Sequence, residues 1–162
     1  MPNLKRYLLE NQCYHSISST RERAPLFADD VAARIVIDCL RNVGQHKTFV
    51  LAYALMPDHL HLLLVPREPF ALSQVMQSIK GYSSRLINER RGKRGSVWER
   101  SYYDRVIRSE RHLRQAIEYI HHNPVAAGIA AGPEDYPYSS AHCDARTDID
   151  AWMKTVSAPE RP

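Results

Sequence analysis

The sequence predicts an α+β domain of the ferredoxin-like sandwich class. We expect an antiparallel four-stranded sheet with helices on one face, in the order β-α-β-β-α-β-α. Short segments rich in β-forming residues alternate with long amphipathic ones. Two of the strand segments are joined by a link so short that they must form an antiparallel hairpin. The 162 residues, 44% of them hydrophobic, suit one domain with its own core.

The first half of the chain predicts a strand, a helix and a second strand. Residues 13–19 alternate weakly between the two faces of a strand. Asp29 or Asp30 is a suitable N-cap for a helix, and Gly44 is the expected stop of that helix. Residues 47–55 are rich in β-formers and predict the second strand.

The central hairpin holds the most informative motif. Residues 56–58 predict a turn, and residues 59–65 return as the third strand. Because side chains alternate along a strand, His59 and His61 point to the same face, and two neighbouring imidazoles make half of a metal site. His15 on the first strand is a further candidate ligand, although a lone strand histidine more often has a structural role.

The second half of the chain predicts two helices and the last strand. Residues 71–90 carry a clear apolar stripe and predict a long helix. Gly81 lies within it at a cost of about 1 kcal/mol relative to alanine, which indicates close packing or the close approach of a ligand. Residues 103–108 predict the fourth strand, and residues 110–122 predict a helix capped by the preceding serine. Pro124 is expected to end this helix, because the residue before a proline is biased away from helical conformation.

Positive charge is concentrated after the long helix. The whole chain has a net charge of +4 and a pI near 9.0. Between residues 85 and 105 the basic side chains outnumber the acidic ones, and Trp98, Tyr102 and Tyr103 lie among them. Such a mixture grips phosphates and stacks bases in DNA-binding proteins, but it is equally typical of a solvated loop over a buried tryptophan. The basic residues of this segment are Arg85, Arg90, Arg91, Lys93, Arg94, Arg100 and Arg105.

Several classes of protein are disfavoured. Cys13, Cys39 and Cys143 show no CxxC spacing, which argues against a disulfide framework and a cysteine-based zinc site. No apolar run has the length needed to span a bilayer, and the N-terminus lacks the apolar core of a signal peptide. We therefore expect a cytoplasmic, nucleoid-associated protein. Its domain would cover residues 1–142, and residues 143–162 would form a polar, partly mobile tail.

A tyrosine and an asparagine on the last predicted helix complete the candidate chemistry. Tyr119 and Asn123 are four residues apart, so on a helix they share a face. An amide oxygen suits Mg²⁺ or Mn²⁺, and a tyrosine beside such an ion is a candidate nucleophile for a DNA phosphodiester. Tyr119 has an alternative role in core packing. His121 and His122 are also candidate ligands, although a doublet at a helix end more often complements the helix dipole.

Two motifs together resemble the HUH-type single-tyrosine transposase family, most closely its branch of REP-associated tyrosine transposases. They are the run Met-Pro-Asp-His-Leu-His at residues 56–61 and the run Tyr-Ile-His-His-Asn-Pro-Val-Ala-Ala-Gly at residues 119–128. The likeness extends over about residues 5–142. It implies an enzyme dependent on Mg²⁺ or Mn²⁺ that cuts and rejoins single-stranded DNA near short hairpins through a covalent 5′-phosphotyrosine.

The resemblance also assigns roles to individual residues. It makes His59, His61 and Asn123 metal ligands and Tyr119 the nucleophile, and Asn123 stands where some relatives carry glutamine. The segment before residues 21–23 is less glycine-rich than is usual in the family, which leaves the role of this loop open. Relatives are monomers or homodimers, and the tyrosine acts either in its own subunit or in the partner.

Other interpretations stay open beside this one. Tyr82, Tyr102 and Tyr103 are rival nucleophiles. A non-catalytic module that binds structured DNA or RNA would use the same sheet and basic segment. A metal-dependent hydrolase would use water in place of the tyrosine, and a structural metal site would affect stability alone.

Overall fold

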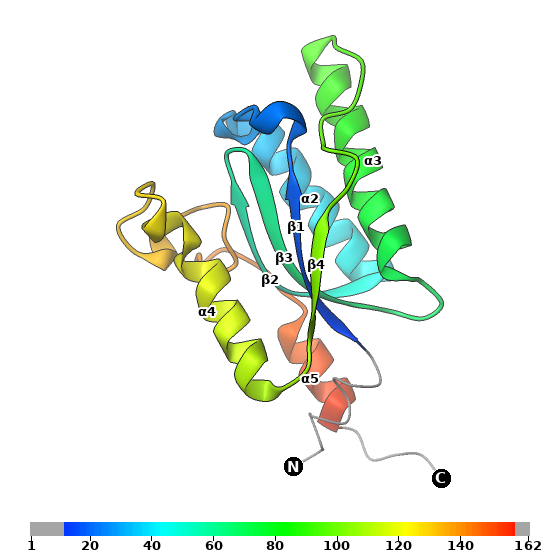
Figure 1. The fold of residues 1–162 in the computed structure, drawn as a ribbon, viewed down its shortest axis with the longest axis vertical. Coiled ribbons are helices and arrows are strands. Elements are labelled where there is room, and N and C mark those ends of the chain that lie inside the picture. The colour runs from blue at the N-terminus through cyan, green and yellow to red at the C-terminus, as the bar shows by residue number, and fades with distance from the viewer. Residues whose placement is uncertain (1–11, 158–162) are drawn as a thin grey trace.

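A computed structural model of the protein describes residues 12–157 and has the predicted antiparallel sheet at its centre (Figure 1). The strands are β1 (Cys13–Ser19), β2 (Thr48–Met56), β3 (His59–Pro66) and β4 (Tyr103–Ile107). They lie in the order β2-β3-β1-β4, and every neighbouring pair is antiparallel. This order, with a helix after β1 and after β3, is the ferredoxin-like sandwich, so the predicted fold class is confirmed.

Helices cover both faces of this sheet, whereas the sequence indicated one (Figure 1). The helices α2 (Asp30–His46) and α3 (Leu72–Arg91) pack on one face, and α4 (Glu110–Ala126) and α5 (Ile149–Ser157) pack on the other. We call these the α3 face and the α4 face. Short 3₁₀ turns lie at Arg21–Arg23, Leu26–Ala28 and Pro133–Asp135.

Strand β3 explains why two helical layers form. Leu60, Leu62 and Leu64 are buried in the core of the α3 face, while Leu63 and Val65 are buried in the core of the α4 face. A strand that is apolar on both sides must be covered on both sides. Within the described residues, none of the helices is both long and apolar enough to cross a membrane.

Two helices extend beyond their predicted ends. Gly44 does not stop α2, which continues to His46, because Gly44 serves close packing: a Cβ atom there would lie 2.6 Å from a carboxylate oxygen of Asp148. Pro124 does not stop α4, which continues to Ala126. Pro124 is buried and lies in the last turn of α4, with only two helical residues after it, so it interrupts little of the helix.

The segment expected to be a polar tail contributes α5 to the fold. Trp152 and Val156 are buried in the core of the α4 face. Asp148 joins the segment to β2, because its backbone N–H donates to the Val50 carbonyl at 2.7 Å and its side chain accepts from the Val50 N–H at 2.9 Å. This part of the chain therefore packs on the sheet, and it was not anticipated as a helix.

Candidate active site

The β2–β3 hairpin places two of the predicted ligands on the α4 face. His59 and His61 pair with Ser19 and Ile17 of β1, and His61 is only 3% exposed. The Nε2 atoms of the two imidazoles lie 3.2 Å apart. The alternation of β3 thus brings the histidines together on one face, as the sequence predicted.

A third imidazole joins this pair from the neighbouring strand. His15 pairs with Leu63 and therefore faces the same side as His61. Its Nε2 atom lies 3.2 Å from Nδ1 of His61. The sequence offered His15 only as a lone strand histidine, since pairing register between distant segments is not readable from spacing.

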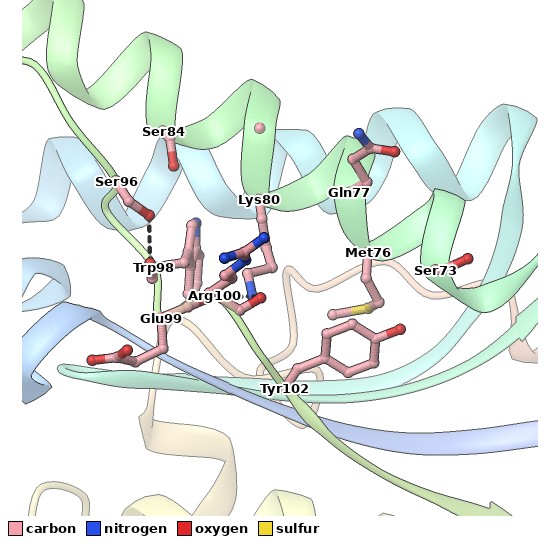
Figure 2. A pocket seen from close by; sticks show the side chains of 11 residues that line it. Ser73, Met76, Gln77, Lys80, Ser84, Ser96, Trp98, Glu99, Arg100 and Tyr102 are labelled. Carbon is pink, nitrogen blue, oxygen red and sulfur yellow. Dashed lines mark hydrogen bonds between the residues drawn. The ribbon is translucent and has the colours of Figure 1, made fainter.

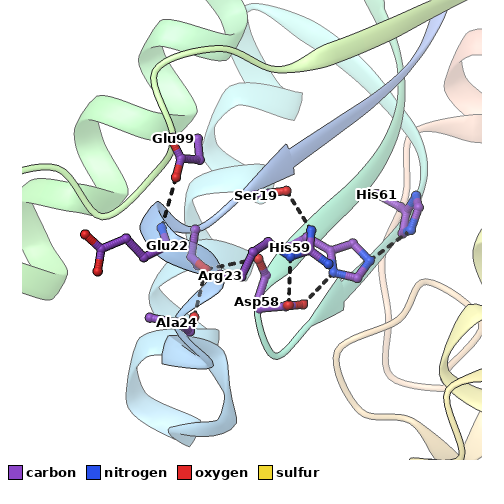
Figure 3. Close-up of polar contacts among 9 residues, drawn as sticks. Ser19, Glu22, Arg23, Ala24, Asp58, His59, His61 and Glu99 are labelled. Atoms are coloured by element: carbon purple, nitrogen blue, oxygen red, sulfur yellow. Dashed lines mark hydrogen bonds and ion pairs between the residues drawn. The ribbon is translucent and has the colours of Figure 1, made fainter.

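A carboxylate orients the first histidine of the pair. Nδ1 of His59 lies 2.6 Å from Oδ1 of Asp58, and the other oxygen of Asp58 forms an ion pair of 3.0 Å with Nε of Arg23 (Figure 3). Arg23 also donates to the Ser19 hydroxyl at 2.8 Å. An imidazole that donates Nδ1–H to a carboxylate keeps its Nε2 lone pair free, which is the state a metal ligand needs.

The loop that carries Arg23 has an unusual backbone. Glu22 and Arg23 adopt φ angles of 57° and 55°, in the left-handed region, at a cost of about 1–3 kcal/mol each for non-glycine residues. The loop is also held by the segment that precedes β4, because the Glu99 side chain accepts the Glu22 N–H at 2.9 Å (Figure 3). Glu22 and Arg23 directly follow the segment in which the family resemblance led us to expect more glycine, and their conformation is one that glycine adopts without strain.

Helix α4 presents the predicted nucleophile to the histidines. The Tyr119 ring centroid lies 5.6 Å from that of His61 and 6.0 Å from that of His15, and the side chain is 55% exposed. Asn123 and Tyr119 line the same hollow on the surface of α4, together with His122. Tyr119 is therefore next to the imidazoles and open to solvent, which does not fit its alternative role in core packing.

The other candidate histidine and the rival tyrosines are placed differently. His121 lies 2.7 Å from the Ser140 hydroxyl, and burial lowers its pKa. Tyr82 is exposed on α3, and Tyr102 packs against the core of the α3 face. Tyr103 pairs with Ile17 and so shares the α4 face, where it is exposed.

Burial keeps the inner imidazoles neutral. It lowers the pKa of His61 to about 3, and the nearby His59, His15 and Arg23 act in the same direction. It lowers the pKa of His15 to about 4, with help from Arg105 and His112. Because a metal binds the neutral form of histidine, these imidazoles are ready to ligate at neutral pH.

The geometry of the His59–His61 pair fits a divalent cation. Two ligand atoms held about 2.1 Å from one ion and at right angles lie about 3 Å apart, close to the 3.2 Å between the Nε2 atoms. A separate group of metal-ligating side chains occurs among the described residues at His142, Cys143 and Asp144. It contains none of the predicted ligands.

The predicted DNA-binding segment is divided between the two faces. Arg85, the first basic residue of the segment, lies on α3 and forms an ion pair of 3.3 Å with Glu89. Arg105 pairs with His15 across the β1–β4 ladder, so it lies on the α4 face beside the imidazoles. Trp98 is 1% exposed and donates its indole N–H to the Ser83 hydroxyl at 2.9 Å, so its ring is not free to stack a base on the surface. The remaining basic residues are exposed at the end of α3 and in the segment after it: Arg90, Arg91, Lys93, Arg94 and Arg100.

Comparisons with known proteins identify relatives of this chain. The family model "Transposase IS200 like" matches residues 9–123, which include both histidines of the hairpin, Tyr119 and Asn123. A Haemophilus influenzae protein named "Putative REP-associated tyrosine transposase" is 28% identical over 120 residues, covering 67% of this chain and 68% of that protein. The REP-associated tyrosine transposase of Escherichia coli is 24% identical over 94 residues, and the match spans 54% of its length.

One solved structure extends the comparison to the fold. A REP-associated tyrosine transposase bound to a REP hairpin superposes with a TM-score of 0.67, over 80% of this chain and 76% of that chain. The sequence identity is 19%, so this likeness concerns the fold.

Proposed function

The chain belongs to the IS200-like transposase family, and on that premise we propose that it cuts and rejoins single-stranded DNA through a covalent 5′-phosphotyrosine at Tyr119. The observation that carries the proposal is the Tyr119 ring, which lies 5.6 Å from His61 although the two residues come from different elements. A solvent-open phenol beside neutral imidazoles is the arrangement that nucleophilic attack on a metal-bound phosphate requires.

The proposed ligands are His59, His61 and the amide oxygen of Asn123, with Mg²⁺ or Mn²⁺ as the ion. Such an ion, when bound, polarises a phosphate oxygen and stabilises the charge that develops on it. Asp58 holds the Nε2 lone pair of His59 toward the ion, and His15 can accept Nδ1–H of His61 and do the same there.

The reaction exchanges one phosphodiester bond for another. The Tyr119 oxygen forms a bond to phosphorus and loses its proton, while the bond from phosphorus to the 3′ oxygen breaks and that oxygen leaves as a hydroxyl. Attack by a 3′ hydroxyl on the phosphotyrosine reverses these steps and rejoins a strand. Because the energy of the bond is retained in the intermediate, no external energy source is needed.

The substrate we propose is a strand that carries a hairpin. The support is the relative of the same fold that is bound to a REP hairpin. Tyr119 contacts the histidines of its own chain, which supports attack within one subunit. Mixing Tyr119→Phe chains with His61→Ala chains tests this directly, since activity would return only if a tyrosine serves the partner's histidines.

The main experiment measures covalent attachment. Labelled single-stranded hairpins with flanks taken from beside the gene are incubated with Mg²⁺ or Mn²⁺, or with EDTA, and run on a denaturing protein gel. We expect a metal-dependent shifted band that is absent in Tyr119→Phe and present in the matched control Tyr103→Phe, an exposed tyrosine on the same face.

Other outcomes would lead to different functions. Cut DNA without a protein adduct would identify water as the nucleophile and a metal-dependent hydrolase. Hairpin binding without any cutting, across both metals, would identify a binding module. An adduct that persists in Tyr119→Phe would overturn the assignment of the nucleophile.

A further inference from the structure

A cavity of about 480 Å³ lies on the α3 face (Figure 2). It is bounded by α3 and by the segment that leads from α3 to β4, and we call it the α3 cavity. Its volume is within the range of about 300–1,000 Å³ typical of small-ligand sites. The residues that matter for its chemistry are Met76, Gln77, Lys80, Trp98, Arg100 and Tyr102.

The α3 cavity combines an apolar interior with a polar rim. Met76 and Trp98 are each 1% exposed and form its base, and the half-buried Tyr102 ring closes one side. Gln77 and Arg100 are exposed and lie at the edge, where their donors and acceptors are accessible. Apolar and aromatic walls with amide and guanidinium groups at the mouth suit a planar ring with hydrogen-bonding edges, which describes a nucleobase.

Lys80 holds the cavity open. Its ammonium group donates to the backbone carbonyls of Glu99, Arg100 and Ser101 at 2.6, 3.3 and 3.2 Å. It also lies 5.5 Å from the centroid of the Tyr102 ring. These contacts fix the segment at its distance from α3, so the space between them is formed before any ligand arrives.

Gly81 lines both the α3 cavity and a neighbouring hollow between α2 and α3. A Cβ atom at Gly81 would meet nothing within 4 Å in the described part of the chain, so close packing does not explain a glycine within α3. Glycine there lowers helix stability by about 1 kcal/mol relative to alanine. A ligand that approaches the backbone at this point would be consistent with the second explanation that the sequence offered.

The α3 cavity and the candidate active site lie on opposite faces of the sheet but at the same end of it, so a bound strand has to pass around this end to reach both. The Glu99 N–H donates to the Ser19 carbonyl at 2.9 Å, and Ser19 pairs with His59 on its other side. Glu99 and His59 are thus two chain spacings apart, about 10 Å, since neighbouring strands lie about 4.8 Å apart. Two exposed arginines, Arg100 at the cavity mouth and Arg94 on the same segment, carry positive charge. This charge suits the phosphates of a strand that runs between the cavity and the candidate active site.

We propose that the α3 cavity binds one unpaired nucleobase of the DNA strand whose phosphate lies at the His59–His61 pair. The inference rests on the proposed function, because it assumes a single-stranded DNA substrate. It makes the cavity a specificity site: the base it accepts decides which strand position reaches Tyr119.

The test adds bulk at the edge of the cavity without disturbing the fold. Gly81→Leu adds a side chain at an exposed residue that lines the cavity, and Gly81→Ala adds only a Cβ atom. Both should keep or raise the melting temperature, because both remove the helical glycine. Gln45→Leu, an exposed position on α2, controls for the added apolar side chain.

The readout is binding in EDTA, so that it is separate from cleavage. The probe is a fluorescent DNA hairpin in which each base of the single-stranded flank is replaced in turn by 2-aminopurine or by an abasic site. On the wild-type chain we expect one flank position to change 2-aminopurine fluorescence. We expect the abasic site at that position to weaken binding about tenfold, the order expected for one stacked base.

The variants then separate the possible outcomes. In Gly81→Leu the fluorescence change should vanish, the affinity for the intact probe should fall about tenfold, and the abasic site should cost nothing further. Gln45→Leu should match the wild type. An unchanged response in Gly81→Leu would overturn the cavity proposal alone, and a wild-type chain that binds no hairpin at all would overturn the proposed function with it. Displacement of the probe by free deoxynucleotides at equal concentration would show a mononucleotide site and also overturn the proposal.

Discussion

The two faces of the sheet are built from alternate residues of the same strands, yet β3 presents only apolar side chains to one face and both histidines and apolar side chains to the other. On the α3 face, Leu60, Leu62 and Leu64 of β3 are packed under two long helices. On the α4 face, the same strand presents His61 near its start and Leu63 and Val65 farther on. Along β3, the polar side chains are thus concentrated at one end of the α4 face.

This difference shows how the molecule buries imidazoles without leaving them unpaired. Each histidine of the His59–His61 pair has a hydrogen-bond partner, which is Asp58 for His59 and His15 for His61. At this end of the α4 face, α4 presents the exposed Tyr119 beside His61. One face therefore serves mainly stability, and the other combines a core with a reactive edge.

The largest expected effect is a difference in stability loss between substitutions at two neighbouring residues, Leu62 and His61, which point to opposite faces. Leu62→Ala should lower the free energy of unfolding by about 2–5 kcal/mol, since it leaves a cavity in a packed core. His61→Ala should cost clearly less in EDTA, because it removes a group whose charged form is disfavoured by burial. Urea denaturation measures both. Adding Mn²⁺ should stabilise the wild type and Leu62→Ala but not His61→Ala, and equal losses in EDTA would contradict the division between faces.

The next effect concerns the carboxylate that orients His59. Asp58→Ala should weaken Mn²⁺ binding about 10–100-fold, while Asp58→Asn, which keeps an oxygen acceptor for Nδ1–H, should lose less. Isothermal titration calorimetry gives the affinities. Asp38→Asn is the matched control, because Asp38 is exposed on α2 and pairs only with Arg41 among the contacts described. Equal affinities for Asp58→Ala and the wild type would remove Asp58 from the site.

The pH dependence of stability should reflect the α4 face. The pKa of His61 is lowered to about 3 and that of His15 to about 4, below the value of about 6.5 in an unfolded chain. As pH falls below about 6.5 the unfolded state takes up protons that the native state does not, so stability is lost between about pH 6.5 and 4. Thermal unfolding in EDTA should show this loss. A His15→Asn, His61→Asn double variant should flatten it, and an equally steep curve would contradict the assignment.

The smallest effect compares basic residues on the two sides. Arg105→Ala and Arg94→Ala should each reduce the slope of log affinity against log salt by about 1 if each residue contacts one phosphate. Only Arg105→Ala should also slow adduct formation at saturating DNA, because Arg105 is the cross-strand neighbour of His15. Fluorescence anisotropy over a salt series and a gel time course measure the two quantities. A slower rate in both variants would mean that Arg94 also reaches the reacting phosphate.

Local patterns in the sequence were enough to predict the strands, the long helices and the shared face of His59 and His61, because strand alternation and helical spacing depend on only a few neighbouring residues. These patterns could not predict contacts between distant segments. His15 meets His61 only through the β1–β3 register, and Arg23 reaches Asp58 only when the loop after β1 packs against the hairpin turn. The role of Gly44 depends on Asp148, more than a hundred residues later. Trp152 is likewise buried only because α5 folds back onto the sheet.

The position of α5 sets an order of events during synthesis on the ribosome. The buried residues of the α3 face, from β1 to Trp98, emerge before those of α4 and α5 and form one core. The α4 face lacks Trp152 and Val156 until the last part of the described chain has emerged. The reactive edge is therefore completed late, so a nascent chain acquires a stable scaffold before it acquires a finished site for breaking DNA.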